Sequence, residues 1–193
     1  MKTVCIYHSI DLDGWMSAAI VKHWFIQNNR NYSIQRIEKE NEPGINPREL
    51  CLGNSTELNE LDFIGYNYGQ PIPDLSGYDK VIMCDISFPK EEMFKLFEKL
   101  DTKFIWIDHH ISAIKNNGEL DKFNIEDIST LYNGLRDTNF AACELTWKYF
   151  MQELQVSRGN QPIAMPEIVR LLGRYDCFGH KDTDEEQKVL AFQ

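Results

Sequence analysis

The amino-acid sequence predicts an α/β fold in which a mostly parallel sheet carries helices on both faces. Short runs of nearly uninterrupted apolar residues are typical of strands that are buried on both sides. Amphipathic segments with helical spacing lie between these runs. Such alternation is the pattern of strands joined by crossover helices in a parallel sheet.

The first part of the chain supplies three of the predicted strands. Thr3 to Tyr7 predicts the first strand, and Gly14 to Asn28 predicts a helix with its apolar residues on one face. Tyr32 to Ile37 alternates apolar and polar residues, which favours a place towards a sheet edge. Residues 41 to 77 hold four of the seven prolines and five of the eleven glycines. That stretch is predicted to be mostly loop, with one strand from Phe63 to Tyr68 inside it.

The remaining elements complete the alternation and then change character. Lys80 to Cys84 and Lys103 to Ile107 predict two further strands. The helix predicted between them, Pro89 to Leu100, begins at a proline, which the first helical turn accepts. Beyond residue 110 the strand pattern fades, and two more helices are predicted at Asn139 to Glu153 and Met165 to Arg174.

Composition and charge exclude several classes of protein. The chain has 193 residues, of which 42% are hydrophobic and 26% charged, so it can bury a core and is not disordered. Its net charge of −10 has the wrong sign for binding long duplex nucleic acid. No apolar window approaches the length of a membrane span or a signal peptide. Five cysteines without a CxxC pair predict buried free thiols, so we expect a cytoplasmic protein without membrane partners.

Acids and histidines follow three of the predicted strands directly. In a parallel sheet ligands bind beyond the carboxyl ends of the strands, where these side chains would meet. Carboxylates and imidazoles in this number suit Mn²⁺ or Mg²⁺ better than the closed thiolate sites of zinc. Crowding so many acids without cations would raise their pKa values and destabilise the fold. The sequence therefore predicts a metal site at the carboxyl ends of the strands, built from His8, Asp11 and Asp13, from Asp85, and from Asp108, His109 and His110.

Each of these residues also has a purely structural interpretation. An aspartate after a strand is often only a turn former or a helix cap, and Asp-His-His can be a polar turn. For Asp11, Asp13 or Asp85 taken alone, the structural role stays open. The joint pattern favours metal, because three separate strand ends would each have to produce metal-type ligands by accident.

The order of these residues resembles motifs I to IV of the DHH phosphoesterase superfamily. This superfamily includes RecJ-type exonucleases, nanoRNases, phosphodiesterases of small nucleotides, exopolyphosphatases and manganese-dependent pyrophosphatases. The resemblance covers residues 4 to about 179, nearly the whole chain. The matching segments are His8-x-x-Asp11-x-Asp13-Gly14, Asp85-Ile86-Ser87, Asp108-His109-His110 and Gly173-Arg174-Tyr175-Asp176.

The resemblance implies a dinuclear Mn²⁺ site, with Mg²⁺ as the alternative ion. Asp85 would bridge the two ions, and His8 and Asp11 would complete the first. His110 would face the substrate phosphate as a catalytic group, with Asp108 as its anchor. The full set of implied metal ligands is His8, Asp11, Asp13, Asp85, His109 and Asp176.

The resemblance also bears on domain organisation. Superfamily members usually carry a second, C-terminal domain with a Gly-Gly-His segment that grips the substrate, and the 193 residues contain no such segment. We expect residues 1–180 to form the DHH phosphoesterase catalytic domain. Residues 181–193 are then a charged tail or the start of a linker to an absent C-terminal domain.

The sequence thus predicts a metal-dependent phosphohydrolase, a phosphodiesterase acting on short oligonucleotides or small nucleotides. A pyrophosphatase or polyphosphatase and a non-catalytic, metal-holding binding module are the alternatives. Arg136 and Arg174 are candidates for binding phosphate bidentately, although a surface or acid-paired arginine is the structural alternative. Tyr66 and Tyr68 could stack a base or simply pack on one face of the sheet. The oligomeric state is not predicted.

Overall fold

A six-stranded sheet forms the centre of the protein, as seen in a computed structural model that describes residues 1–29, 31–37, 49–51, 58–118 and 132–191. The strand order is β3-β2-β4-β1-β5-β6, and every neighbouring pair is parallel except β2 with β3. The predicted mostly parallel α/β sheet is therefore confirmed. The strands are β1 (Lys2–His8), β2 (Tyr32–Ile37), β3 (Glu49–Cys51), β4 (Asn59–Tyr66), β5 (Lys80–Cys84) and β6 (Phe104–Ile107).

Two strands differ from the sequence prediction in extent or position. Strand β4 begins at Asn59, before the predicted Phe63, and ends at Tyr66. Strand β2 lies next to the edge of the sheet, as predicted, and the edge strand is β3, which pairs with β2 antiparallel from within the region predicted as loop. Residues 38–48 and 52–57 of that predicted loop lie outside the described residues.

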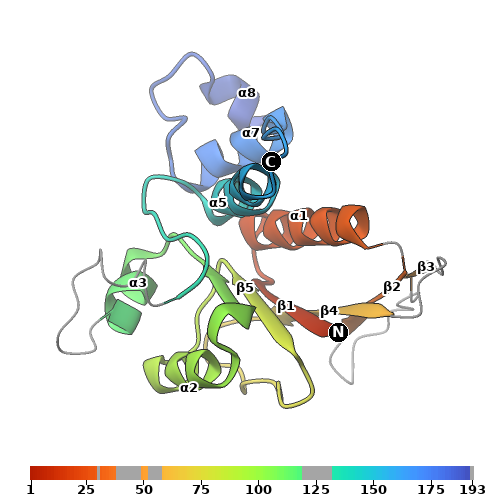
Figure 1. Ribbon diagram of the computed structural model, residues 1–193. Coiled ribbons are helices and arrows are strands. Elements are labelled where there is room, and N and C mark those ends of the chain that lie inside the picture. Colours follow the sequence, from red (N-terminus) through yellow and green to blue (C-terminus); the bar gives the residue numbers. More distant parts are fainter. Residues whose placement is uncertain (30, 38–48, 52–57, 119–131, 192–193) are drawn as a thin grey trace.

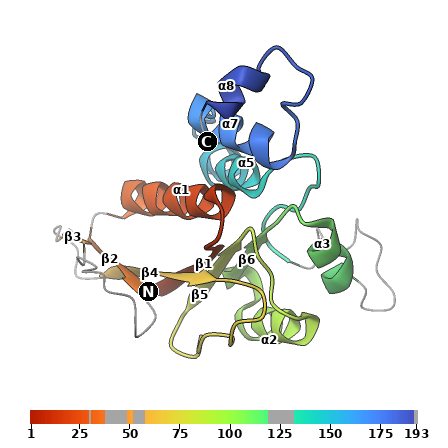
Figure 2. The same ribbon diagram turned by 180° about the vertical axis from the view of Figure 1, so that it is seen from behind.

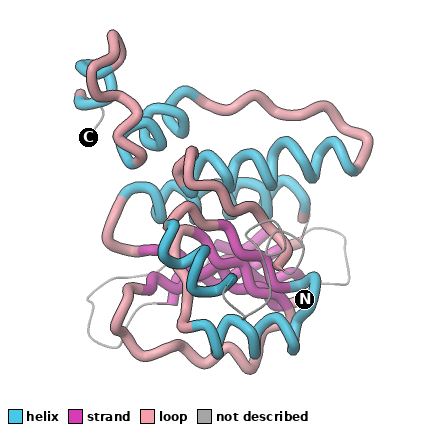
Figure 3. The backbone as a smooth tube through the Cα atoms, turned by 90° about the vertical axis from the view of Figure 1, so that its left-hand side faces the viewer, coloured by secondary structure: helices cyan, strands magenta, loops and turns pink. Residues whose placement is uncertain are grey.

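Helices cover both faces of the sheet (Figures 1 and 2). On one side lie α1 (Leu12–Asn28), α5 (Ala142–Trp147) and α7 (Glu167–Asp176), and on the other lie α2 (Lys90–Leu100) and α3 (Ile111–Gly118). Figure 3 shows the strands between these two helical layers. The shorter elements are a 3₁₀ turn at Asp101–Lys103, a π-helical segment at Lys148–Glu153, α6 (Leu154–Ser157) and α8 (Glu186–Leu190).

The central strands β1, β5 and β6 are mainly apolar, because both of their faces are covered. In β1, Cys5 and Tyr7 belong to the core beneath α1 and α5, whereas Val4 and Ile6 belong to the core above α2 and α3. Successive side chains of a strand point to opposite faces. Most polar side chains of these three strands therefore lie at or near the strand ends, and the motifs directly follow those ends.

The C-terminal half differs in detail from the predicted helices. The helix expected from Asn139 begins at Ala142 and passes into the π-helical segment at Lys148–Glu153. The charged run after residue 180 packs back on α7, since Glu185 lies 2.7 Å from the Arg170 guanidinium and Val189 is buried. Whether a linker follows stays a prediction.

The cysteine prediction is only partly right. Cys5, Cys84 and Cys143 are buried free thiols, as expected. Cys51 is exposed because it lies on the edge strand β3, and Cys177 is half-buried just after α7.

None of the helices in the described ranges has the length and apolar content needed to cross a membrane.

A short segment after the gap at 119–131 extends the sheet beside β6. The Trp106 amide donates to the Asn133 carbonyl (2.8 Å), and the Asp108 amide donates to the Leu135 carbonyl (3.1 Å). Gly134 makes this approach possible, because its φ is 114° and a Cβ there would lie 2.2 Å from the Trp106 carbonyl oxygen. The end of β6, which carries Asp108, is thus held by a segment that needs glycine at position 134.

We expect Gly134→Ala to destabilise the protein by about 2 to 4 kcal/mol, because the added methyl group clashes with backbone at a positive φ. Gly77→Ala is the matched control, since a Cβ at Gly77 meets nothing within 4 Å. Urea unfolding of the two variants measures the difference. Equal midpoints would contradict the account of this segment.

Candidate metal centre

The predicted ligands converge at the carboxyl ends of β1, β5 and β6. These three strands are neighbours in the sheet, so the residues that follow them share one edge. The C-terminal end of α7 brings a further acid to the same place, with Asp176 Oδ2 lying 3.2 Å from His109 Nε2. The structure brings together all six side chains that the sequence suggested as metal ligands, namely His8, Asp11, Asp13, Asp85, His109 and Asp176.

Asp85 occupies the middle of this cluster. Its carboxylate oxygens lie 3.5 Å from His8 Nδ1 and 3.3 Å from His109 Nε2. The side chain is buried, and neither oxygen has a hydrogen-bond partner in the portion of the chain that the structure describes. Asp85 also has a φ of 62°, a rare backbone conformation for a residue with a side chain. A buried carboxylate without donors is costly unless a cation neutralises it, so this carboxylate fits a divalent metal ion.

One group of candidate ligands comes from the turn between β1 and α1. His8 Nδ1 lies 2.7 Å from Asp11 Oδ2, and these two residues can hold an ion together with Asp85. The other oxygen of Asp11 accepts a hydrogen bond from the Gly14 amide (3.0 Å) and caps α1. A Cβ at Gly14 would lie 2.0 Å from the His8 carbonyl oxygen, so glycine is needed for this tight turn. Asp11 therefore has both the structural role and a place in the cluster.

A second group surrounds His109. Its Nε2 faces Asp85 and Asp176, while its Nδ1 lies 3.8 Å from Cys177 Sγ. His109, Asp176 and Cys177 form another set that can hold an ion. Cys177 is not among the ligands expected from the sequence, where its position next to Asp176 is the only signal for it.

Asp13 is held differently from the other predicted ligands. Its two carboxylate oxygens accept hydrogen bonds from the Ala142 amide (2.8 Å) and the Cys143 amide (2.7 Å) at the start of α5. One of these oxygens, Oδ2, also lies 3.7 Å from His109 Nε2 in the cluster. Asp13 thus caps a helix far along the chain, which explains why α5 begins later than predicted. Its role as a metal ligand stays a prediction.

Asp108 and His110 form a pair at the end of β6. Asp108 is fully buried and accepts hydrogen bonds from the His110 amide (3.0 Å) and from Trp106 Nε1 (3.3 Å). His110 Nδ1 lies 2.8 Å from the same carboxylate, and this contact raises the pKa of His110. The pair fixes the ring and directs the other ring nitrogen, Nε2, away from Asp108.

The two predicted phosphate-binding arginines have structural partners. The Arg136 guanidinium donates to the backbone carbonyls of Tyr132 (2.7 Å) and Trp106 (2.8 Å), among others. Arg174 lies 3.5 Å from the Glu185 carboxylate. These contacts agree with the alternative that the two arginines have structural roles. A role in substrate binding stays a prediction for both residues.

The charges of the cluster shift several pKa values. Contact with Asp11, and then with Asp85, raises the pKa of His8 to about 10. Burial acts to lower the pKa of His109, but its close contact with the Asp85 carboxylate and the charges of neighbouring acids raise it to about 11. Burial, followed by the charge of Asp85, raises the pKa of Asp13 to about 8. Without metal, protons bound to His8, His109 and Asp13 thus reduce the negative charge of the cluster in place of metal cations.

Fold and cluster together define an α/β protein with a candidate divalent-metal centre at the carboxyl edge of its sheet. A family model described as DHH family, N-terminal domain, matches residues 3–172. The chain belongs to the DHH family, whose members are phosphoesterases, and this membership indicates hydrolase activity in the broad sense. Asp176 lies beyond the matched residues. Comparisons with curated proteins and with solved structures give no match.

We expect metal binding to release protons and therefore to strengthen as pH rises. At pH 7 the metal-free protein holds His8, His109 and Asp13 protonated, because their pKa values lie at about 10, 11 and 8. Metal ligands must be unprotonated. The affinity for Mn²⁺ should rise about tenfold or more per unit between about pH 6 and pH 8, since at least one proton leaves per ion. Calorimetry in buffers of different ionisation enthalpy counts the protons, and a pH-independent affinity would contradict the ligand set.

We also expect Asp85→Asn to weaken both metal ions, because this carboxylate lies between the two groups of ligands. Mn²⁺ affinity should fall by about 100-fold or more at both positions, more than for the loss of an outer hydrogen bond. Asp176→Asn should weaken one ion only. Asp184→Asn, an exposed acid outside the cluster, serves as the control. Unchanged stoichiometry and affinity in Asp85→Asn would refute the bridging position.

Proposed function

We propose that this protein is a metal-dependent phosphodiesterase that hydrolyses small nucleotides or short oligonucleotides at a dinuclear Mn²⁺ centre. The observation that carries the proposal is the buried Asp85 carboxylate, which has no hydrogen-bond donor among the described residues and belongs to two of the three groups of side chains there that could hold a metal ion. In a chain of the DHH family, this arrangement supports two-metal phosphoester hydrolysis. Mg²⁺ is the alternative ion.

The metal ions, His110 and Asp108 would have different roles in the hydrolysis. Divalent ions held here would supply positive charge to the phosphate oxygens and lower the pKa of the attacking water. The water gives up one proton to solvent and its oxygen bonds to phosphorus, while the bond to the leaving oxygen breaks and that oxygen takes up a proton. His110 is suited to donate it, because Asp108 raises its pKa and holds its ring through Nδ1. Asp108 is a positioning residue in this scheme.

The surroundings of the cluster favour a nucleotide over pyrophosphate. A cavity of about 310 Å³ adjoins Asp11 and Asp176 on the side of α1 and α7. Two of its lining residues, Trp15 and Tyr175, are aromatic, and each side chain is held in place by a contact with a neighbouring residue. Trp15 donates from Nε1 to the Ser9 carbonyl (3.1 Å), and Tyr175 stacks on a buried histidine. Each of the two is 40% exposed. Preordered aromatic faces suit a base or sugar, whereas pyrophosphate would leave them unused.

Charge and thiol chemistry support the same substrate class and location. With a net charge of −10, the protein lacks the basic surface that long nucleic acids require, so a short substrate is favoured. The five cysteines are free thiols, which supports a reducing cytoplasm.

The proposal is tested by the release of p-nitrophenol from bis-p-nitrophenyl phosphate in the presence of Mn²⁺. We expect turnover that chelation of the metal abolishes and that added Mn²⁺ restores. A metal-holding binding module would take up Mn²⁺ without any turnover. Metal-loaded protein without turnover would therefore overturn the catalytic assignment.

We expect His110→Ala to keep its metal content but to lose about 100-fold or more in kcat, the usual worth of a positioned acid or electrophile. His23→Ala, on the exposed side of α1, is the matched control and should retain full activity. Metal content measured by mass spectrometry separates the possible outcomes. If the metal is lost together with the activity, His110 is a ligand and its catalytic role is wrong.

A further inference from the structure

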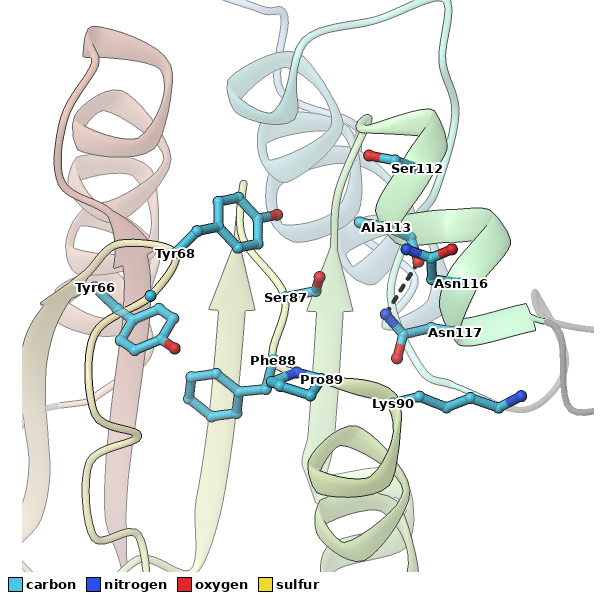
Figure 4. Close-up of a pocket in the computed structure, with 11 residues that line it drawn as sticks. Tyr66, Tyr68, Ser87, Phe88, Pro89, Lys90, Ser112, Ala113, Asn116 and Asn117 are labelled. Carbon is cyan, nitrogen blue, oxygen red and sulfur yellow. Dashed lines mark hydrogen bonds between the residues drawn. The ribbon is translucent and has the colours of Figure 1, made fainter.

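A second cavity adjoins the cluster on the side of α3, between the end of β4 and the loop after β5 (Figure 4). Two of its lining residues link it to the cluster, since Ser87 follows Asp85 by two positions and Ser112 follows His110 by two. Its volume is about 270 Å³. Sites for drug-sized ligands usually enclose about 300 to 1,000 Å³. This cavity therefore suits a single flat ring system.

Aromatic rings line the cavity from its wall to the edge of the cluster. Tyr66 is buried, its hydroxyl donates to the Gln70 carbonyl (3.1 Å), and its ring meets Phe88 edge to face at 4.9 Å. Tyr68 is 54% exposed, and its ring centre lies 6.1 Å from that of His8. The ring of Tyr68 thus lines the cavity and also lies close to His8, one of the predicted metal ligands. Rigid aromatic walls of this kind bind planar ligands by stacking.

Asn117 gives the cavity one specific polar group. The side chain is 2% exposed, and its Nδ2 donates to the Ala113 carbonyl (3.0 Å). Because a carbonyl only accepts, the amide nitrogen must face it, and Oδ1 must point the other way. Figure 4 shows this oxygen turned towards the side of Pro89 and Lys90. Oδ1 is buried and has no hydrogen-bond partner among the described residues. Since buried polar atoms are normally paired, this oxygen is an acceptor that a ligand could satisfy with a hydrogen-bond donor.

The chemistry of the walls narrows the class of ligand. An unpaired buried acceptor repels anions and selects a group that carries an N–H or O–H. Lys90 is the one cation among the described lining residues, and its ammonium group extends away from the other side chains (Figure 4). The ligand is thus a neutral, flat ring with a hydrogen-bond donor, rather than a phosphate or a metal ion.

We infer that this cavity binds the base of a nucleotide whose phosphate lies at the metal cluster, and that Asn117 Oδ1 accepts a hydrogen bond from an amino group of that base. The inference rests on the proposed phosphodiesterase function and names the part of the substrate that is recognised. Adenine, cytosine and guanine carry such an amino group. Unsubstituted purine has the same ring system without it.

The test compares two substrates that differ only in this amino group. They are the p-nitrophenyl esters of adenosine 5′-phosphate and of purine riboside 5′-phosphate, assayed with Mn²⁺. The full chain should hydrolyse the adenosine ester with a kcat/KM at least about fivefold higher, the worth of one buried hydrogen bond. Asn117→Ala should bring the ratio close to one. Lys115→Ala, which truncates an exposed side chain on the same helix that does not line the cavity, should keep the ratio.

The ratio separates recognition from a merely structural role, which would slow both esters alike. Bis-p-nitrophenyl phosphate carries no base and reports on the metal centre alone. If it is not hydrolysed, the proposed function fails. If it is hydrolysed but the two esters have equal kcat/KM in the unmodified protein, only this inference is overturned. An unchanged ratio in folded Asn117→Ala would likewise exclude Asn117.

Discussion

Everything at the carboxyl edge of the sheet depends on keeping several carboxylates close together and out of water. Asp13 and Asp85 are both nearly fully buried, and burial of a negative charge is costly unless something compensates for it. The fold compensates for Asp13 with two backbone amides at the start of α5. It compensates for part of Asp11 with the start of α1. No such donor reaches Asp85 from the described residues, so the balance at the centre is left to protons on the histidines or to metal ions.

The backbone around the cluster is correspondingly unusual. Asp85 has a positive φ although it is not a glycine, and Gly14 and Gly134 allow contacts that any Cβ would block. Strain of this kind persists only where the surrounding structure enforces it. Here the enforcing contacts are the parallel strands on both sides of β5 and the segment that hydrogen bonds to β6. The same contacts fix the pair formed by Asp108 and His110. The rigid sheet therefore holds the residues of the site in position.

The sequence was sufficient for features that depend on local pattern and strand direction. Continuous apolar runs predict a sheet that is covered on both faces. The rule that parallel strands end at one edge of the sheet predicts that His8, Asp85 and His109 lie close together. Features that depend on contacts between distant segments were not predictable. The capping of α5 by Asp13 joins residues 129 positions apart. The neighbourhood of Cys177 and His109, and the unpaired oxygen of Asn117, likewise arise only once the helices are packed.

The two cavities beside the cluster have different chemical characters, and this difference bears on the substrate. A phosphodiester has an organic group on each side of phosphorus, whereas pyrophosphate has none. On the α1 and α7 side, Trp15 and Tyr175 offer exposed aromatic faces, which stack on any base because every base has a π-face. On the α3 side, Asn117 adds a buried acceptor to aromatic walls, and such a group discriminates by leaving a wrong ligand unpaired. Under the proposed function, a nucleotide substrate that spans the cluster would be bound by stacking, without preference for a base, on one side and through the amino group of its base on the other.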